Sequence, residues 1–357
     1  MVREENSPLS RSSTAPRKIL VTGGAGFIGS HFIRHLLAEK ENQVVNLDAL
    51  RYSGNLDNLK DVEGDSRYRF VHGDICDAVL VDKVVREHRI EAIVNFAAET
   101  HVDRSIVEPA GFVRTDVVGT SVLLEAARAA GVQRFVQVST DEIYGDVPTG
   151  RSSESGQLAP RSPYAASKAA GDLLALSYFT TYRFPVLVTR GSNTFGPNQY
   201  PEKFIPLFVT NALEDQPLPL YGDGLQQRDW LYVQDHCEGI ALMLRKGESG
   251  QVYNLGAGQE RPNLEVAEAI LGLLGKPRSL LRHVTDRPGH DRRYALNCEK
   301  IAKLGWAPRF PFGEALKTTV GWYRDNASWW RKIKSGEFRA YYEKMYGARL
   351  REGQGGR

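Results

Sequence analysis

The sequence has few cysteines, no long hydrophobic run and little net charge, and each of these absences excludes a class of protein. The three cysteines (Cys76, Cys237 and Cys298) are odd in number and widely spaced, so they form neither a disulfide framework nor a metal-binding pattern. No apolar stretch approaches the roughly 20 residues that span a membrane, and residues 1–16 lack the apolar segment of a secretory signal. The net charge of +3 comes from intermixed acidic and basic residues, which gives no indication of nucleic-acid binding. We therefore expect a cytoplasmic protein without a metal site and without nucleic-acid or membrane partners.

What remains is an ordinary globular composition, 41% hydrophobic and 25% charged, in which short apolar runs alternate with helical patterns. The predicted strands are Lys18–Thr22, Gln43–Leu47, Tyr68–His72, Ala92–Ala97, Arg134–Ser139 and Val186–Arg190. The predicted helices are Gly29–Lys40, Leu80–His88, Phe112–Ala130 and Pro163–Thr181. This alternation predicts an α/β fold of the Rossmann type, with a doubly wound parallel sheet.

The pattern becomes less regular after about Gly196, where proline and glycine are more frequent. We expect a smaller mixed α/β lobe there that binds substrate, with a soft boundary because the Rossmann sheet can borrow elements from it. The predicted divisions are a disordered arm over 1–16, a Rossmann domain over 17–195, a substrate lobe over 196–330, and a helix and tail over 331–357.

A glycine-rich segment after the first predicted strand indicates a dinucleotide site. Gly23, Gly26 and Gly29 lie between a strand and a helix, a spacing that brings backbone N–H groups close to a pyrophosphate. Asp48 ends the second strand, where a carboxylate binds ribose hydroxyls and repels a 2′-phosphate. The sequence therefore predicts NAD as the cofactor.

A second group of residues carries the chemistry. Tyr164 and Lys168 are four residues apart at the start of a predicted helix, so they share a face, and the ammonium would lower the pKa of the phenol. This pair alone suggests oxidation of an alcohol. Thr140 ends a strand where its hydroxyl could hold the same substrate oxygen, and Asp141 and Glu142 follow it. The residues alone leave two readings of these carboxyls: plain loop acids, or an acid and a base that could remove water.

These motifs resemble the extended short-chain dehydrogenase/reductases, and among them the dTDP-glucose 4,6-dehydratases. The resemblance extends from about Lys18 to Tyr323. The glycines and Tyr164–Lys168 are common to the superfamily, whereas Thr140-Asp-Glu142, Arg228-Asp-Trp230 and Asp286-Arg-Pro-Gly-His290 are more specific. The resemblance implies a lyase of deoxysugar biosynthesis that keeps NAD tightly bound.

The resemblance also implies a role for each catalytic residue. Tyr164 removes the proton of the sugar 4-hydroxyl while hydride leaves C4 for NAD, and the 4-ketone then acidifies the C5 proton. Glu142 takes that proton, Asp141 protonates the leaving 6-hydroxyl, and hydride returns to C6 to give dTDP-4-keto-6-deoxy-glucose. Burial beside Glu142 is expected to raise the pKa of Asp141, as an acid requires.

Asp74, Ile75, Ala97 and Ala98 follow the ends of predicted strands, which face the cofactor in such a sheet. The other binding residues, apart from the glycines and Asp48 discussed above, follow from the resemblance. The residues expected to bind NAD are Gly23, Gly26, Phe27, Ile28, Gly29, Asp48, Asn55, Asp74, Ile75, Ala97, Ala98, Thr115, Tyr164 and Lys168. The residues expected to bind the nucleotide sugar are Thr100, Thr140, Asn193, Lys203, Phe204, Pro219, Tyr221, Arg228, Asn263, Arg287 and His290.

The chain departs from the family pattern at a few positions. Gly191 and Thr194-Phe195 stand where the family often has Cys and Asn-Tyr, next to the substrate residue Asn193. Residues 324–349 form an aromatic, basic extension that we interpret as a packed helix and tail.

The sequence also suggests an oligomeric state and leaves several alternative functions open. The family forms homodimers through helices that match Phe112–Ala130 and Pro163–Thr181, and the first of these has more apolar surface than one core-facing stripe requires. The alternatives are a 4,6-dehydratase of a UDP- or GDP-linked hexose, a nucleotide-sugar 4-epimerase and a catalytically silent NAD-binding scaffold. An epimerase would not need the carboxyl pair after Thr140.

Overall fold

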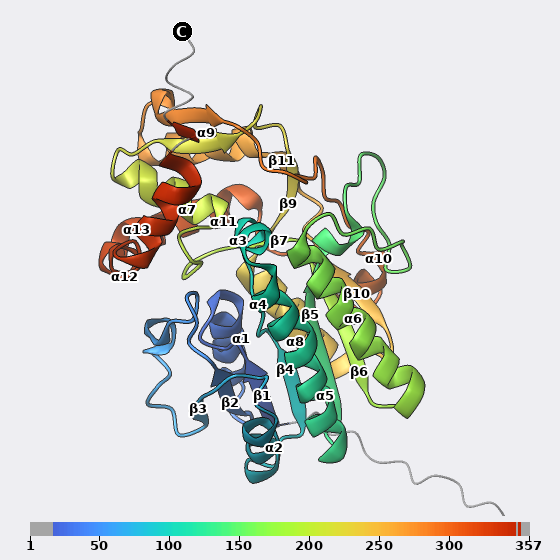
Figure 1. Cartoon of the computed structure of the whole chain (residues 1–357). Helices are drawn as coiled ribbons and strands as arrows, with labels where there is room; N and C mark the ends of the chain where they lie inside the picture. The colour runs from blue at the N-terminus through green and yellow to red at the C-terminus, as the bar shows by residue number, and fades with distance from the viewer. Residues whose placement is uncertain (1–16, 348, 351–357) are drawn as a thin grey trace, which may run out of the picture.

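A seven-stranded sheet in which every pair is parallel forms the centre of the molecule (Figure 1). The structure, a computed structural model, describes residues 17–347 and 349–350. The strand order is β10-β6-β5-β4-β1-β2-β3. The strands are β1 (Lys18–Thr22), β2 (Gln43–Asp48), β3 (Tyr68–His72), β4 (Ala92–Asn95), β5 (Arg134–Thr140), β6 (Val186–Gly191) and β10 (Val252–Leu255). Because parallel strands all end at the same edge, the residues that follow them converge there.

Helices cover both faces of this sheet, and the alternation of side chains along each strand explains why both faces are apolar. Ile19 and Val21 belong to one hydrophobic cluster, and Leu20 between them belongs to the other. The first face is covered by α1 (Phe27–Leu37) and α8 (Val233–Lys246). The opposite face is covered by α2 (Ala78–Glu87), α5 (Thr120–Ala129) and α6 (Pro163–Tyr182). The predicted doubly wound Rossmann-type sheet is therefore confirmed.

The long helix predicted over Phe112–Ala130 is wrong in detail. It begins earlier, as α4 (Pro109–Val113), continues through a π-helical segment η2 (Arg114–Gly119), and only then becomes α5. A Cβ added to Gly119 would lie 2.4 Å from the Ile75 side chain, so the glycine lets the wide turn approach the loop after β3. Gly131, with a φ of +71°, ends the helix as expected. The fourth strand also stops early, at Asn95, because the chain then turns into the cavity described below.

The C-terminal half contributes a lobe at one end of the sheet (Figure 1). It contains a three-stranded sheet, β11-β9-β7, and a two-stranded pair, β12-β8. Its strands are β7 (Asn193–Phe195), β8 (Leu218–Tyr221), β9 (Gln227–Tyr232), β11 (Glu260–Pro262) and β12 (Leu281–Val284). Its helices are α7 (Phe204–Leu213), α9 (Asn263–Leu274), α10 (Glu299–Ala302), α11 (Phe312–Asp325), α12 (Ala327–Ile333) and α13 (Glu337–Tyr342), with the short η4 (Arg278–Leu280) and the π-helical η5 (Glu343–Gly347). Three further short segments precede the lobe in sequence: η1 (Leu56–Leu59), α3 (Val102–Val107) and η3 (Asp141–Tyr144).

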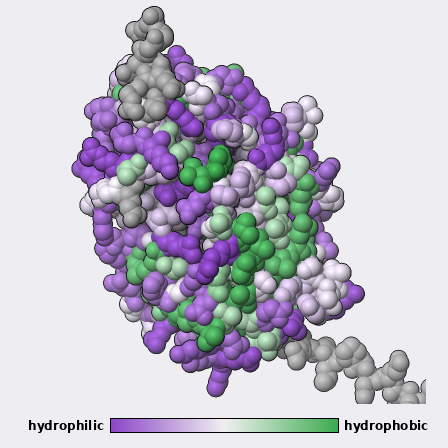
Figure 2. All heavy atoms as spheres, viewed as in Figure 1, coloured by the Kyte–Doolittle hydropathy of each residue, from purple (hydrophilic) through white to green (hydrophobic). Residues whose placement is uncertain are grey.

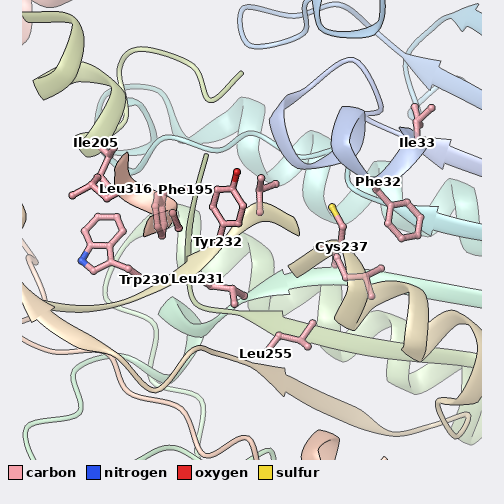
Figure 3. Close-up of a cluster of buried hydrophobic side chains, with 14 of the residues drawn as sticks. Phe32, Ile33, Phe195, Ile205, Trp230, Leu231, Tyr232, Cys237, Leu255 and Leu316 are labelled. Atoms are coloured by element: carbon pink, nitrogen blue, oxygen red, sulfur yellow. The ribbon is translucent and has the colours of Figure 1, made fainter. Parts of the chain in front are cut away.

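One hydrophobic core joins the lobe to the sheet. Figure 3 shows Phe32 of α1 and Cys237 of α8 in the same cluster as Phe195, Trp230 and Leu316 from the lobe. Moreover, β10 and α8 lie beyond residue 196 in sequence but belong to the Rossmann layers. The lobe is therefore held in a fixed relation to the sheet edge. Within residues 17–347 and 349–350, no helix has both the length and the apolar character of a membrane span.

Candidate active site

A cavity of about 280 Å³ lies at the carboxyl edge of the sheet, and the glycine-rich segment forms part of its wall. Gly23 has a φ of +67°, and a Cβ there would lie 2.7 Å from the backbone nitrogen of Ala97. A Cβ on Gly29 would lie 2.4 Å from the carbonyl oxygen of Gly23. Only glycine fits both positions, so backbone N–H groups at the start of α1 can approach an anion closely. This cradle fits the pyrophosphate of a dinucleotide.

Asp48 marks one end of this cavity. Its carboxylate oxygens accept hydrogen bonds from the backbone N–H groups of Ala25 at 2.9 Å and Leu50 at 2.8 Å. Burial raises the pKa of this carboxyl, and the two backbone bonds oppose that effect. The carboxylate is thus held in a fixed position, with lone pairs left for the hydroxyls of a ribose.

The catalytic candidates meet at the other end of the same cavity. Thr140 ends β5, and its hydroxyl accepts the backbone N–H of Glu142 at 3.3 Å, which caps η3 and turns Asp141 and Glu142 into the cavity wall. Tyr164 and Lys168 lie one turn apart in the first turns of α6 and line the same wall. The Thr140 hydroxyl also hydrogen-bonds to the phenol of Tyr164. All five residues proposed from the sequence therefore share one site.

The electrostatics of the carboxyl pair match the sequence-based expectation. Burial and the neighbouring charge of Glu142 raise the pKa of Asp141 far above its usual range. Its Oδ2 atom is buried and has no hydrogen-bond partner among the described residues. Burial also raises the pKa of Glu142, against the opposing charges of Arg287, Arg228 and Lys203. A proton is therefore readily kept on Asp141.

The expectation that the pKa of Tyr164 is lowered is wrong. Burial and the charges of Glu142 and Asp116 raise the pKa of the phenol well above its usual value, rather than lowering it. Lys168 is bound to the backbone of the neighbouring strand, where its Nζ donates to the carbonyl oxygen of Val138 at 2.8 Å. It is not among the main causes of the shift, which are burial and the nearby carboxyls.

A second cavity of about 150 Å³ lies against the lobe, and its wall contains nine of the eleven residues expected to bind the nucleotide sugar. Nine line it directly: Asn193, Lys203, Phe204, Pro219, Tyr221, Arg228, Asn263, Arg287 and His290. The other two, Thr100 and Thr140, line the first cavity. Glu142, Asn193 and Lys203 belong to both walls, so the two cavities meet at these residues.

The second cavity concentrates cations. Arg287 pairs with Asp103, its Nη1 lying 3.2 Å from a carboxylate oxygen, while its Nε atom is buried without a partner among the described residues. Arg228 donates to the Asp291 carbonyl at 2.9 Å and stacks on the Tyr294 ring at 4.3 Å. Lys203 is anchored to the carbonyl oxygen of Thr100. Fixed guanidinium groups of this kind suit a diphosphate.

His290 and Asn263 add polar groups to the same wall. The Nδ1 atom of His290 lies 2.6 Å from the Asp286 carboxylate, and burial together with the charges of Arg287 and Arg228 lowers its pKa to about 4. The Oδ1 atom of Asn263 is buried without a partner among the described residues. These groups are available to a ligand that carries both donors and acceptors.

Apart from Tyr164 and Lys168, twelve residues were expected to bind NAD, and all of them except Asn55 line the first cavity. Its side chain instead accepts the backbone N–H of Asp57 and caps η1, beside the cavity. The residues in place are Gly23, Gly26, Phe27, Ile28, Gly29, Asp48, Asp74, Ile75, Ala97, Ala98 and Thr115. The fit of this set to NAD rests on the glycine cradle and on the fixed carboxylate of Asp48.

Several lining residues were not expected from the sequence. Arg51 and His236 line the first cavity, and Tyr294 and Tyr346 line the second. Tyr346 comes from the C-terminal extension, and the neighbouring Arg349 donates to the hydroxyl of Tyr221 at 2.8 Å. No local motif marks these residues; only Arg51, three positions after Asp48, follows a strand end that the sequence had already indicated.

Comparison with known proteins decides the family. Residues 20–319 match the family model described as GDP-mannose 4,6 dehydratase. A dTDP-glucose 4,6-dehydratase of Streptomyces niveus is 54% identical over 89% of this chain and 96% of its own length. The chain belongs to the dTDP-glucose 4,6-dehydratase family. A solved structure of such a dehydratase from Streptomyces venezuelae, with NAD bound, is 51% identical, has a TM-score of 0.87 and covers 89% of this chain and all of its own.

Membership of the dTDP-glucose 4,6-dehydratase family confirms the main expectations from the sequence. These are the fold, a lyase activity on a nucleotide-linked glucose, and NAD as the cofactor. The Thermus thermophilus UDP-glucose 4-epimerase, solved with NAD, is 34% identical, has a TM-score of 0.81 and covers 87% of this chain and 99% of its own. Dehydratases and epimerases thus share this fold. The fold alone therefore does not determine the reaction, and the residues where the two cavities meet have to be considered.

Proposed function

We propose that this chain converts dTDP-glucose into dTDP-4-keto-6-deoxy-glucose, with Tyr164, Glu142 and Asp141 as its proton-transfer groups. One observation supports this assignment above the others. A cavity that fits NAD and a cavity rich in cations meet at Glu142, Asn193 and Lys203. A hexose bound at that junction would expose its C4, C5 and C6 atoms to the catalytic residues.

Oxidation at C4 comes first, because the C5 proton is too weakly acidic to be removed before a ketone exists beside it. Bound NAD supplies a reversible hydride acceptor. Tyr164 takes the proton of the 4-hydroxyl, and the hydrogen bond from Thr140 orients the phenol for that transfer. The phenolate is the form of Tyr164 that accepts this proton, and the ionised carboxyl of Glu142 opposes that form. Lys168 supplies a compensating positive charge in the same wall.

Elimination of water follows from the second pair of groups. Glu142 accepts the C5 proton, and Asp141 donates a proton to the departing 6-hydroxyl. Burial and the charge of Glu142 favour the protonated form of Asp141, which is the form that can act as an acid. The two carboxyls come from consecutive residues at the start of η3, so one local turn places the acid beside the base.

The nucleotide is held at a distance from this chemistry. Arg228, Arg287 and Lys203 form the cationic wall that would bind the diphosphate, and Pro219 with Tyr221 lies where the base would pack. These three cations enter the cavity from separate segments of the chain. The alternative nucleotide hexoses remain outcomes of the substrate test below, since the cationic wall alone recognises any nucleoside diphosphate.

The decisive experiment compares wild type with Glu142→Gln on dTDP-glucose. The amide keeps the size of the side chain but cannot accept the C5 proton, so we expect oxidation at C4 to proceed and product formation to fall about 1,000-fold. Absorbance at 340 nm follows the reduced cofactor in a single turnover, and the 4-keto chromophore in alkali follows the product. Product formed by this variant at near the wild-type rate would refute the role of Glu142. A wild-type product epimerised at C4 with its 6-hydroxyl retained would refute the dehydratase assignment.

We also propose that the chain forms a homodimer through α4, η2, α5 and α6, in the cytoplasm. Large apolar side chains are exposed on these elements, including Val113 at 52%, Val118 at 49% and Leu173 at 58%. Figure 2 shows apolar side chains gathered over the face where Figure 1 places α4, α5 and α6. A patch of this kind supports an interface between two copies. Light scattering at micromolar concentration tests it, and a monomer mass for the wild type would refute it.

A further inference from the structure

His236 is the most unusual residue of the first cavity that the reaction above leaves unused. It lies in the first turn of α8, is 2% exposed and lines the cavity. Its Nδ1 atom is 2.8 Å from the hydroxyl of Thr194, whereas its Nε2 atom has no partner among the described residues. Because a buried polar atom without a partner destabilises a protein, its position in a ligand cavity indicates that a ligand atom completes it.

Gly191 makes room for this ring. A Cβ at Gly191 would lie 2.6 Å from Cε1 and 2.7 Å from Nε2 of His236, so any other residue would push the imidazole away. The backbone of Gly191 is outside the left-handed region, and its conformation therefore does not require glycine. Thr194 holds the same ring at its other nitrogen, 2.8 Å from Nδ1. The glycine, the threonine and the imidazole thus form one unit.

The register of the sheet places this unit at the catalytic end of the cavity. Gly191 pairs directly with Thr140 across β5 and β6. Asp48 lies on β2, which β4 and β1 separate from β5. In a dinucleotide whose adenosine ribose binds at Asp48 and whose pyrophosphate binds at the glycine cradle, the nicotinamide end is the part that reaches His236.

The hydrogen-bond partners of Thr194 assign His236 Nε2 as an acceptor. The hydroxyl of Thr194 has a single proton, which we assign to the bond with the carbonyl oxygen of Ser192 at 3.1 Å. With this assignment Nδ1 of His236 carries the proton and donates it to Thr194, which leaves a lone pair on Nε2. Burial lowers the pKa of His236 to about 4, so the ring is neutral near pH 7. The missing partner is therefore an N–H or O–H donor.

We infer that Nε2 of His236 accepts a hydrogen bond from the carboxamide N–H of the nicotinamide, and that Gly191 and Thr194 hold the ring for this contact. The inference rests on the proposed function in assigning the catalytic end of the cavity to the nicotinamide. It makes His236 a residue that binds the cofactor, with no part in proton transfer to the sugar. Its effect is to fix the rotation of the nicotinamide amide, and hence the orientation of the ring beside Tyr164.

The test uses 3-acetylpyridine adenine dinucleotide, in which a methyl group replaces the amide nitrogen of NAD and removes both N–H donors. Dissociation constants of the two dinucleotides are measured by competition on the full-length protein. In wild type we expect NAD to bind about tenfold more tightly than the analogue, as one hydrogen bond provides. In His236→Phe we expect the two constants to agree within about twofold, because only NAD loses a partner. An unchanged preference for NAD in this variant would overturn the inference.

Two neighbouring positions supply variants that keep the imidazole. Gly191→Ala should displace the ring and abolish the preference for NAD as His236→Phe does. Thr194→Ser keeps the hydroxyl and should retain the preference, whereas Thr194→Val should reduce it. A wild-type preference in both Gly191→Ala and Thr194→Val would overturn the inference even if His236→Phe failed to fold. These readouts are affinities, so they are independent of the roles assigned to Asp141 and Glu142.

Discussion

The two cavities bind their ligands by different physical means. The dinucleotide cavity is formed at the ends of parallel strands, and its key features are backbone geometry: glycines that admit close approach and a carboxylate fixed by two backbone N–H groups. The nucleotide-sugar cavity is formed by side chains, chiefly Lys203, Arg228 and Arg287, that come from a strand and two separate loops of the lobe. Binding in the first cavity depends on glycines that lack a side chain, and binding in the second depends on the cationic side chains themselves.

This difference has a consequence for substitution. A backbone cradle tolerates almost no added atom, because main chain on both sides cannot move independently. A wall of long cationic side chains tolerates conservative exchange, because each side chain can adjust and several share the same anion. We therefore expect the largest losses from small changes in the glycine cradle and graded losses in the cationic wall.

Gly29→Ala is the substitution from which we expect the largest loss of NAD affinity. The new methyl group would lie 2.4 Å from the carbonyl oxygen of Gly23, so the cradle must open. We expect NAD to bind about 100-fold more weakly, which corresponds to roughly 3 kcal/mol of strain. Gly272→Ala, in α9 with no atom within 4 Å of the new Cβ, is the matched control and should leave NAD affinity unchanged. Equal behaviour of the two variants in a fluorescence titration would contradict the distinction between the cavities.

Asp116→Asn tests a buried carboxyl next in sequence to Thr115, which lines the dinucleotide cavity. Burial raises the pKa of Asp116 from 3.8 to about 6, although Lys168 and a hydrogen bond from Ser167 oppose this shift. A raised folded-state pKa means that the stabilisation is complete below about pH 4 and is lost as the pH rises through about 6. The loss should reach on the order of 2–3 kcal/mol in the free energy of unfolding.

The amide cannot ionise and still accepts the bond from Ser167. The advantage of Asp116→Asn over wild type should therefore grow from pH 4 to pH 7 in urea unfolding. A difference that stays constant over this range would show that Asp116 titrates normally in the folded protein.

Arg287→Lys tests the cationic wall. The charge is kept, but the fork that holds Asp103 and presents Nε to the ligand is lost. We expect the KM for dTDP-glucose to rise about tenfold with kcat changed less than threefold, because the diphosphate is bound equally in the ground and transition states. Arg292→Lys, an exposed residue paired with Asp223 in the same segment, should leave KM unchanged. A fall in kcat as large as the rise in KM would place Arg287 in the chemical step.

The same contrast explains how much could be predicted from the sequence. Strand alternation, the glycine spacing and Asp48 are local signals, so the Rossmann sheet and the NAD cavity follow from periodicity and spacing alone. The substrate residues depend on segments more than 100 residues apart, from Thr100 to His290, and only resemblance to a family brought them together. The pKa of Tyr164 was misjudged because it depends on burial and on Asp116, neither of which the Tyr164–Lys168 spacing reveals. The π-helical segment before α5 was missed for a similar reason, since the close approach of Gly119 to Ile75 is a tertiary contact that helical periodicity does not reveal.

Tyr346 was predicted neither from local sequence signals nor from the family resemblance, because it belongs to the C-terminal extension, which had no assigned role. Its ring is 6% exposed, lies 6.0 Å from the ring of Tyr221 and lines the nucleotide-sugar cavity. Tyr346→Phe removes the hydroxyl that bonds Tyr221, and we expect KM to rise about threefold without a change in kcat. Tyr342→Phe, four residues away, loses only a bond from Asn211 outside the cavity wall and is the matched control. Equal changes of KM in both variants would show that the hydroxyl of Tyr346 has no specific effect on nucleotide affinity through Tyr221.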